Sequence, residues 1–181
     1  MCKILLIIDM QRDFVDGPLG SPEAQAIVPN VVEKVKNWDG ALTIFTRDTH
    51  FEDYMNTLEG KKLPVPHCIT DTEGWHIIDE LKKVIKPNTV VIDKYTFGFD
   101  GWKYEILHRC VDNITSPDEL DITLIGVCTD ICVVSNALAI RMAFPNAKIT
   151  VDASCCAGVT PEKHAAALKV MKSCQIEVIN E

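Results

Sequence analysis

Six short apolar runs alternate with helical patterns along the chain, and this alternation constrains the fold more than any other feature. The runs cover residues 3–9, 41–46, 89–93, 120–126, 148–152 and 176–179. Each is almost continuously apolar, which is typical of strands buried on both faces of a parallel sheet. The intervening patterns predict helices over 22–37, 76–85, 102–112, 130–143 and 161–173. We therefore expect an α/β fold of three layers, with a mostly parallel six-stranded sheet between helices.

Local signals refine this picture at three places. Pro29 is expected to break or restart the helix predicted over 22–37. Thr129 precedes the last long apolar helix, 130–143, and is predicted to be its N-cap. The stretch 47–75 is too long and irregular for a simple connection, and loops of that length usually carry function.

Length and charge limit the classes of protein to which the chain can belong. Its 181 residues suit one domain, and we expect residues 1–181 to form a single domain. A net charge of −8 argues against a broad surface for nucleic acid or anionic membranes. The apolar run at 4–8 is too short for a signal peptide or a membrane span, and Asp9 interrupts it. We expect a cytoplasmic protein with neither nucleic acid nor membrane as a partner.

The chain has eight cysteines, and their pattern does not predict a disulfide framework. They are Cys2, Cys68, Cys110, Cys128, Cys132, Cys155, Cys156 and Cys174. No pair has the C-x-x-C spacing of zinc ribbons, and several lie in apolar runs, where free cysteine behaves as a small hydrophobic residue. Without a secretory signal, we expect free thiols. Adjacent Cys155 and Cys156 are interpreted as packing residues.

Polar residues of catalytic type follow most of the predicted strands. They are Asp9 after the first run, Asp48 and His50 after the second, Asp93 and Lys94 after the third, Cys128 and Cys132 after the fourth, and Asp152 after the fifth. Ligands bind at the carboxyl ends of strands in open parallel sheets, so these residues are expected to converge. Taken singly, each residue also has an ordinary structural interpretation that fits the sequence equally well. Asp9 could form a hydrogen bond to a neighbouring loop, and Lys94 could lie on a solvated surface. Together they indicate a nucleophile, a base and a cation.

The two cysteines of residues 126–133 are expected to differ in role. Cys132 falls near the third position of the predicted helix, where the helix dipole and free N–H groups stabilise a thiolate. Cys128 lies before the cap and is interpreted as a buried structural thiol. Helix placement therefore favours Cys132 as the nucleophile. A redox pair of Cys128 and Cys132 is a competing hypothesis, but it lacks the usual C-x-x-C spacing and leaves Asp9 and Lys94 unexplained.

Five motifs occur in a characteristic order and spacing. They are IIDMQRDF (7–14), TRDTH (46–50), LPVPHC (63–68), DKYTFGF (93–99) and GVCTDICV (126–133). Over nearly the whole chain, this set resembles the isochorismatase-like cysteine hydrolases, and within them the nicotinamidase-type amidases. The resemblance implies a Rossmann-like topology and hydrolysis of a small carboxamide. Nicotinamide, cleaved to nicotinate and ammonia through a cysteine thioester, is the expected substrate.

The resemblance also implies a catalytic triad of Asp9, Lys94 and Cys132. Asp9 would accept the thiol proton and deliver it to the leaving amine, and Lys94 would hold the ion pair. Cys132 would attack the carboxamide carbon. The family has a cis peptide before the residue that matches Cys128, which directs the backbone N–H groups of Cys128 and Cys132 at the oxyanion.

A metal site is implied by the same resemblance. The pattern maps onto Asp48, His50 and His67, with Glu59 as a possible further ligand. These donors suit one divalent ion, zinc first, with iron or manganese as alternatives. In such enzymes the metal orients the pyridine nitrogen of the substrate. The competing interpretation is that His50 and His67 only form loop hydrogen bonds.

The resemblance also implies residues of a substrate pocket. Phe14 matches an aromatic residue that packs on the substrate, and Tyr95 and Phe97 are candidate walls, with ordinary core packing as the alternative. Leu63 stands where nicotinamidases commonly carry a tryptophan, and the loop after Lys94 is shorter than in many of them. Both departures favour another small amide or carbamoyl compound as the alternative substrate.

Three further expectations complete the sequence interpretation. Family members often form dimers or tetramers, so we expect a homo-oligomer. A catalytically silent metal-binding member of the same fold is a third hypothesis for function. The remaining histidines, His76, His108 and His164, fall on or near helical patterns and are expected at the surface.

Overall fold

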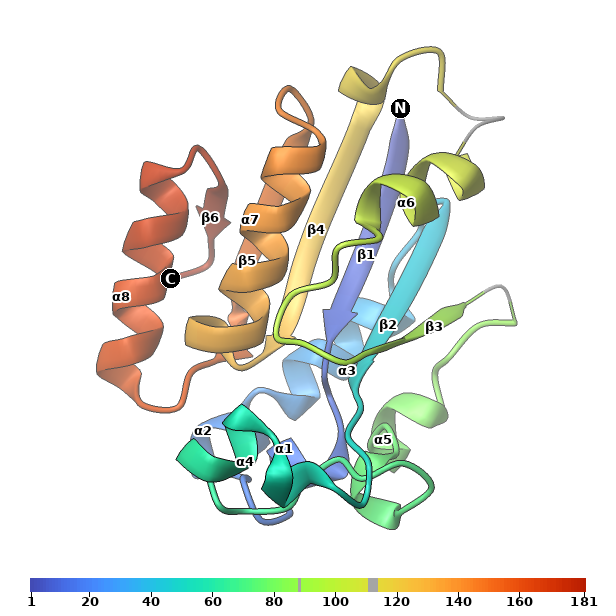
Figure 1. The fold of residues 1–181 in the computed structure, drawn as a ribbon. Coiled ribbons are helices and arrows are strands. Elements are labelled where there is room, and N and C mark those ends of the chain that lie inside the picture. The colour runs from blue at the N-terminus through green and yellow to red at the C-terminus, as the bar shows by residue number, and fades with distance from the viewer. Residues whose placement is uncertain (88, 111–113) are drawn as a thin grey trace.

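The chain folds into a six-stranded parallel sheet with helices on both faces, as the computed structural model of residues 1–87, 89–110 and 114–181 shows (Figure 1). The strands are β1 (Cys2–Ile8), β2 (Leu42–Asp48), β3 (Val90–Lys94), β4 (Leu120–Val127), β5 (Lys148–Ala157) and β6 (Glu177–Ile179). Their order is β3-β2-β1-β4-β5-β6, and every neighbouring pair is parallel. The predicted α/β class is confirmed. β5 continues to Ala157, beyond its predicted end at Asp152.

The helices divide between the two faces of the sheet. They are α1 (Arg12–Val15), α2 (Pro22–Ala26), α3 (Val28–Lys36), α4 (Leu58–Lys62), α5 (Asp79–Lys82), α6 (Trp102–Cys110), α7 (Val134–Ala143) and α8 (Pro161–Ser173). Short turns are η1 (Tyr54–Asn56), η2 (Glu73–Trp75), η4 (Pro117–Glu119) and the π-helical η5 (Thr129–Val133). In Figure 1, α6, α7 and α8 cover the front face, and α3 lies behind the sheet. None of the helices in the described part of the chain has the length and apolar character needed to cross a membrane.

Two of the predicted helices differ from the structure. The helix predicted over 22–37 ends at Ile27 and restarts with Pro29 in its first turn, as the proline signal indicated. The helix predicted over 76–85 is reduced to the short α5. Residues 111–112 of the predicted 102–112 helix lie outside the described residues, and α6 ends at Cys110.

The core is built on the alternation of side chains along the central strand. Ile4, Leu6 and Ile8 of β1 pack with the layer of α6, α7 and α8, whereas Leu5 and Ile7 pack with α1, α3 and α5. Successive side chains of a strand point to opposite faces, so β1 contributes to both apolar layers. All five side chains are fully buried, and burying each stabilises the fold by about 1.5–3 kcal/mol. The continuous apolar run of β1 is therefore required by its central position.

The expectation that all eight cysteines are free is wrong for one pair. Cys2 at the start of β1 and Cys110 at the end of α6 form a disulfide, with their Cα atoms 6.5 Å apart. The crossover from β3 to β4 carries α6 back over the start of the sheet, which brings together two cysteines 108 residues apart. The free cysteines are Cys68, Cys128, Cys132, Cys155, Cys156 and Cys174. Cys155 and Cys156 are buried, as their interpretation as packing residues requires.

The order in which strands are added to the sheet reverses between β1 and β4. From β1 it adds β2 and β3 on one side, and then it crosses to β4, β5 and β6 on the other. At the carboxyl end of this pair, Gly126 aligns with Ile8 and has a φ of 119°. A Cβ atom on Gly126 would lie 2.1 Å from the backbone oxygen of Ile8, so only glycine allows this close approach. Ligand sites form at such switch points, where loops from the two directions diverge.

Candidate active site

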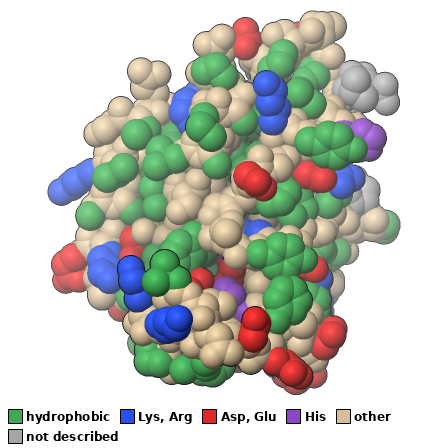
Figure 2. All heavy atoms as spheres, viewed as in Figure 1, with side chains coloured by type: hydrophobic (Ala, Val, Ile, Leu, Met, Phe, Trp, Pro, Cys, Tyr) green, Lys and Arg blue, Asp and Glu red, His purple; other side chains and the backbone are tan. Residues whose placement is uncertain are grey.

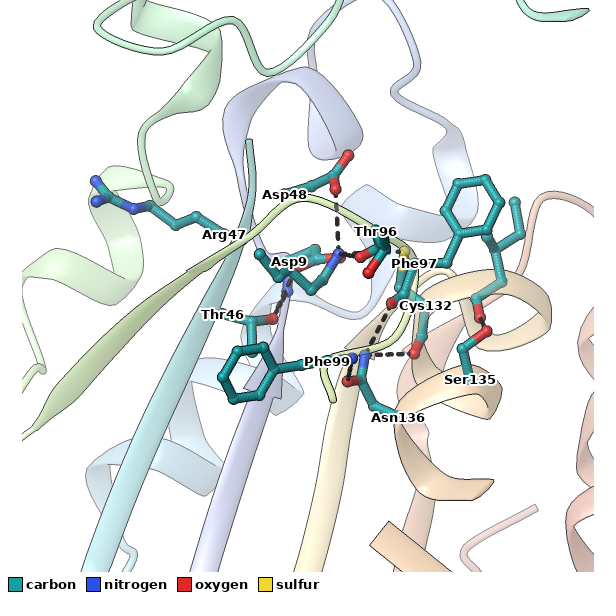
Figure 3. Close-up of polar contacts among 12 residues, drawn as sticks. Asp9, Thr46, Arg47, Asp48, Thr96, Phe97, Phe99, Cys132, Ser135 and Asn136 are labelled. Atoms are coloured by element: carbon teal, nitrogen blue, oxygen red, sulfur yellow. Dashed lines mark hydrogen bonds and ion pairs between the residues drawn. The ribbon is translucent and has the colours of Figure 1, made fainter. Parts of the chain in front are cut away.

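Asp9, Lys94 and Cys132 meet at the carboxyl edge of the sheet, at the switch point between β1 and β4 (Figure 3). Asp9 follows β1, Lys94 ends β3, and Cys132 lies in η5 after β4. The ammonium nitrogen of Lys94 is 2.7 Å from Asp9 Oδ2 and 3.7 Å from Cys132 Sγ. All three side chains are buried, with 0%, 1% and 5% of Asp9, Lys94 and Cys132 exposed. The lysine therefore joins the carboxylate to the thiol among buried side chains.

Burial and charge together determine the protonation of this group. Burial would lower the pKa of Lys94, but Asp9, Cys132 and Asp48 more than offset it, and the net pKa is raised. Burial raises the pKa of Asp9 above its usual range, and the ammonium of Lys94 opposes that rise. Burial, followed by the charge of Asp9, raises the pKa of the Cys132 thiol well above its usual value. The resting site is thus a lysine–carboxylate ion pair beside a neutral thiol.

This protonation differs from the expectation that the helix N-terminus stabilises a Cys132 thiolate. Burial disfavours the charged thiolate and is the largest cause of the raised pKa of Cys132. The thiol proton therefore needs an acceptor at the moment of reaction. Asp9 is the nearest carboxylate joined to Cys132, through Lys94.

Thr46 orients the Asp9 carboxylate, and the sequence analysis did not single it out. Its hydroxyl donates a hydrogen bond of 2.6 Å to Asp9 Oδ1 and accepts one of 3.1 Å from the Asp9 backbone N–H. Asp9 has a φ of 50°, a left-handed conformation that aspartate tolerates better than most residues. Thr46 thus occupies one carboxylate oxygen and leaves Oδ2 to Lys94. The only sequence signal was its place at the head of the TRDTH motif.

The turn that carries Cys132 begins differently from the prediction. Cys128, not Thr129, is the N-cap residue of η5, and the Val127–Cys128 peptide is cis, as the family resemblance implied. A hydrogen bond of 2.8 Å instead joins the Thr129 hydroxyl to Nδ1 of His164 on α8. His164 is therefore half-buried against the nucleophile turn rather than a free surface histidine. Burial lowers the pKa of His164, which keeps its ring neutral near pH 7.

Four potential metal ligands lie beside the triad. One ligand atom from each of Asp48, His50, Glu59 and His67 lies within 4.8 Å of every other. His50 Nε2 is 3.0 Å from Asp48 Oδ2, and His67 Nε2 is 3.7 Å from both Asp48 Oδ2 and Glu59 Oε1. Nδ1 of His67 donates to the backbone oxygen of Val65 at 2.8 Å, which leaves Nε2 as the nitrogen facing the cluster. Two imidazoles and two carboxylates around one point fit a divalent transition metal.

Gln11 holds the strand end that presents Asp48, and the sequence analysis missed this residue as well. Its side-chain oxygen accepts from the Asp48 backbone N–H at 2.7 Å, and its side-chain nitrogen donates to the Asp48 backbone oxygen at 2.9 Å. The same nitrogen donates to the backbone oxygen of Trp75 at 2.8 Å. Gln11 is fully buried, so it fixes β2 against the loop that contains η2. Its signal was its place inside the IIDMQRDF motif.

A cavity of about 700 Å³ opens onto Cys132 of the triad and onto three of the four potential metal ligands. Its polar part includes Cys132, Asp48, Glu59 and His67, and its apolar walls include Phe14, Leu19, Leu63, Phe97 and Ile131. Figure 2 shows histidine and acidic side chains recessed among hydrophobic groups on the lower half of this face. A mostly apolar cavity with a few convergent polar groups is typical of a small-molecule site.

Tyr95 and Asp152 lie away from this cavity, contrary to the sequence prediction. Tyr95 is 62% exposed and stacks on Phe51, with ring centroids 5.7 Å apart, so we remove it from the candidate pocket. Asp152 lies within β5 rather than at its end, and its carboxylate pairs with Lys34 on the opposite side of the sheet from α7. The sequence analysis ended this strand at Asp152 and so placed Asp152 at the carboxyl edge of the sheet. The strand extends to Ala157, and Asp152 lies in its middle.

Several known proteins resemble this chain in sequence and fold. The nicotinamidase of Schizosaccharomyces pombe is 27% identical over 98% of this chain and 92% of its own. A crystal structure of nicotinamidase/pyrazinamidase PncA from Bacillus subtilis is 25% identical and covers 99% of this chain and 100% of its own, with a TM-score of 0.84. Pyrococcus horikoshii pyrazinamidase, in complex with zinc, is 26% identical, covers 99% of both chains and has a TM-score of 0.79. The isochorismatase domain model matches residues 3–181. The chain therefore belongs to the isochorismatase family.

Proposed function

We propose that the protein is an amidase that hydrolyses nicotinamide to nicotinate and ammonia. The observation that carries this proposal is the buried Asp9–Lys94–Cys132 group, whose Cys132 lines a mostly apolar cavity. A neutral thiol beside a lysine–carboxylate pair suits acyl transfer, in which a nucleophile and a proton acceptor act together. The relatives named as nicotinamidases support the choice of nicotinamide.

Acylation begins with transfer of the Cys132 thiol proton to the Asp9 carboxylate. The sulfur attacks the carboxamide carbon, and the carbonyl π electrons move onto oxygen. The backbone N–H groups of Cys128 and Cys132 donate to that oxyanion. When the tetrahedral intermediate collapses, the C–N bond breaks and protonated Asp9 gives its proton to the departing amine, which leaves as ammonia. The product on the enzyme is a Cys132 thioester.

Deacylation uses the same groups in the reverse direction. Asp9, again ionised, accepts a proton from a water molecule, whose oxygen attacks the thioester carbonyl. Collapse of the second tetrahedral intermediate breaks the C–S bond, and the sulfur regains its proton from Asp9. Lys94 stays charged throughout and keeps Asp9 close to the sulfur in a site from which water is largely excluded.

Asp48, His50, His67 and Glu59 are proposed to hold one divalent metal ion, with zinc as the first candidate. When bound, the ion would orient the pyridine nitrogen of the substrate. The ring would lie between Phe14 and Phe97, which both line the cavity. Phe14 also contacts the ligand cluster, since its ring centroid is 5.4 Å from that of His67. The binding determinants for the ring therefore adjoin the carboxamide site.

Another small amide on the same triad is the second candidate substrate. Leu63 lines the cavity and offers no aromatic face to a pyridine ring. The cavity, at about 700 Å³, is also much larger than nicotinamide. Both features suit a larger or less planar carboxamide or carbamoyl compound.

Ammonia release from a panel of small amides tests the proposal. The panel contains nicotinamide, pyrazinamide and carbamoyl compounds, and the metal-replete protein is compared with Cys132→Ala. We expect turnover of nicotinamide that the substitution abolishes. Turnover of a different amide only would replace nicotinamide while keeping the triad, and full activity of Cys132→Ala would refute the mechanism.

A further inference from the structure

Asn136 is a fully buried polar residue that the mechanism above does not use. It lies in the first turn of α7, between the nucleophile turn and the loop that follows β3. Its amide nitrogen donates to the backbone oxygens of Cys132 and Phe97, at 2.8 and 3.0 Å. Its amide oxygen accepts from the backbone N–H of Phe99 at 3.0 Å (Figure 3). The same oxygen accepts from Nε1 of Trp102 at 2.8 Å. A primary amide has two N–H donors and two acceptor sites, so Asn136 is saturated.

The loop of residues 95–99 depends on these bonds. In the described part of the chain, no main-chain hydrogen bond outside helices and strands involves residues 95–99, and the pairing of β3 ends at Lys94. The Lys94 ammonium donates to the Thr96 oxygen at 3.2 Å, and the Thr96 hydroxyl donates to the Gly98 oxygen at 2.6 Å. Asn136 adds a bond on each side of Gly98. A segment with few backbone hydrogen bonds keeps one conformation only where side chains hold it.

The same side chain therefore contacts both halves of the proposed site. Cys132 supplies the nucleophile, and Phe97 supplies one wall of the cavity. Asn136 is four residues after Cys132, which places both on the same side of the helix. Burying an amide costs free energy unless all its polar atoms are hydrogen-bonded, whereas burying an apolar side chain carries no such cost. Core packing alone therefore does not account for an asparagine at this position.

We propose that Asn136 is a positioning residue that fixes the Phe97 wall relative to the Cys132 sulfur and thereby sets the affinity for an aromatic carboxamide. The inference rests on the proposed amidase function. The structural observation behind it is that one side chain bonds both the 95–99 loop and the turn that carries Cys132. Ordinary core packing at Asn136 would stabilise the fold without linking Phe97 to substrate binding.

Asn136→Ser separates the two sets of contacts. A serine hydroxyl at this position can donate to the carbonyl four residues earlier, that of Cys132, but it is too short to reach Phe97. The substitution loses the bonds to Phe97, Phe99 and Trp102. We expect KM for nicotinamide to rise at least about tenfold, the factor for a single hydrogen bond of ordinary strength, while kcat stays within about twofold. Asn30→Ser is the matched control, since Asn30 on α3 also donates through its side chain, to the Ser154 oxygen at 2.9 Å. It should leave KM unchanged.

A double-mutant cycle with Phe97→Leu distinguishes positioning from packing. If Asn136 acts through Phe97, Asn136→Ser changes KM little once Phe97 has been replaced. If the two residues act independently, the KM change of the double variant equals the product of the changes in the two single variants. Agreement with that product within about twofold would overturn the inference. Thermal unfolding of each variant verifies that the compared proteins are folded.

Alkylation of Cys132 by iodoacetamide gives a readout that needs no turnover. Peptide mass spectrometry follows the rate at Cys132 in the wild type, Asn136→Ser and Asn30→Ser. A released Phe97 wall should raise that rate several-fold in Asn136→Ser alone, and an unchanged rate would overturn the inference. A wild-type protein that releases no ammonia from any amide would refute the proposed function, whereas the alkylation comparison would still decide the role of Asn136.

Discussion

Replacing Asp9 with asparagine removes the proposed proton acceptor while keeping the shape of the side chain. Asp9 Oδ2 lies 2.7 Å from the Lys94 ammonium, and Thr46 donates to the other oxygen. A neutral amide cannot take the Cys132 proton, and a positioned general base contributes about 10²–10⁴ to a rate. We therefore expect Asp9→Asn to lower kcat/KM by about a thousandfold.

The same substitution has a calculable effect on stability. Removing one partner of a buried ion pair costs about 3–5 kcal/mol when the remaining charge is left alone. Lys94 would keep Asp48, whose Oδ1 is 3.2 Å from its ammonium. We therefore expect a smaller loss, about 1–3 kcal/mol, which lowers Tm by roughly 2–10 °C for a chain of this size.

Steady-state ammonia release and thermal unfolding measure the two effects separately. Asp93→Asn is the matched control, because Asp93 lies next to Lys94 but pairs with Arg47 outside the cavity, at 2.6 and 2.9 Å. The control should keep its activity and lose a little stability. A folded Asp9→Asn protein with activity within about tenfold of the wild type would refute the assignment of Asp9 as the proton acceptor.

Three further predictions concern the metal ligands, acid stability and the second thiol. His67→Asn should lower metal affinity by more than about a hundredfold; the metal content of dialysed protein measures this, and retained metal would contradict the ligand set. Burial would raise the pKa of Asp152, but hydrogen bonds led by that from Lys34 lower it. The ionised carboxylate then stabilises the fold above its unfolded pKa, near 4, by about 1–3 kcal/mol, and this contribution is lost as pH falls further. Wild-type Tm should thus drop more steeply than that of Asp152→Asn below about pH 4, and parallel curves would contradict the pairing. Cys128→Ala should keep kcat within about threefold, since only its backbone N–H is proposed to act; a loss as large as that of Cys132→Ala would favour a redox pair.

The sequence indicated the sheet and much of the site because both are encoded locally. A strand buried on both faces must be continuously apolar, and the polar residue after it must lie at the sheet edge. For this reason Asp9, Lys94 and Cys132 were expected to converge, and the family resemblance then implied their roles as a triad. The long 47–75 stretch was recognisable as functional because a simple connection does not need that length, and it supplies His50, Glu59 and His67.

Other features depend on contacts between segments that no local pattern records. The Cys2–Cys110 disulfide follows from the path of α6 across the sheet, and Thr129 bonds His164 on α8 instead of capping its own helix. The expected Cys132 thiolate differs from the raised pKa of this thiol because the helix terminus is visible in the sequence, whereas the burial of the side chain is not. Tyr95 is exposed, and it comes directly after the end of β3 at Lys94, where the alternation of a strand no longer determines the direction of a side chain.

Direct detection of an acyl group on Cys132 is the most direct test of the proposed chemistry. Protein is mixed with nicotinamide, quenched in acid within the first turnover, digested and mapped by mass spectrometry. We predict a nicotinoyl thioester on the peptide that contains Cys128 and Cys132, with fragmentation placing it on Cys132, and no adduct in Cys132→Ser. Ammonia release without any adduct, or an adduct on another residue, would contradict nucleophilic attack by Cys132.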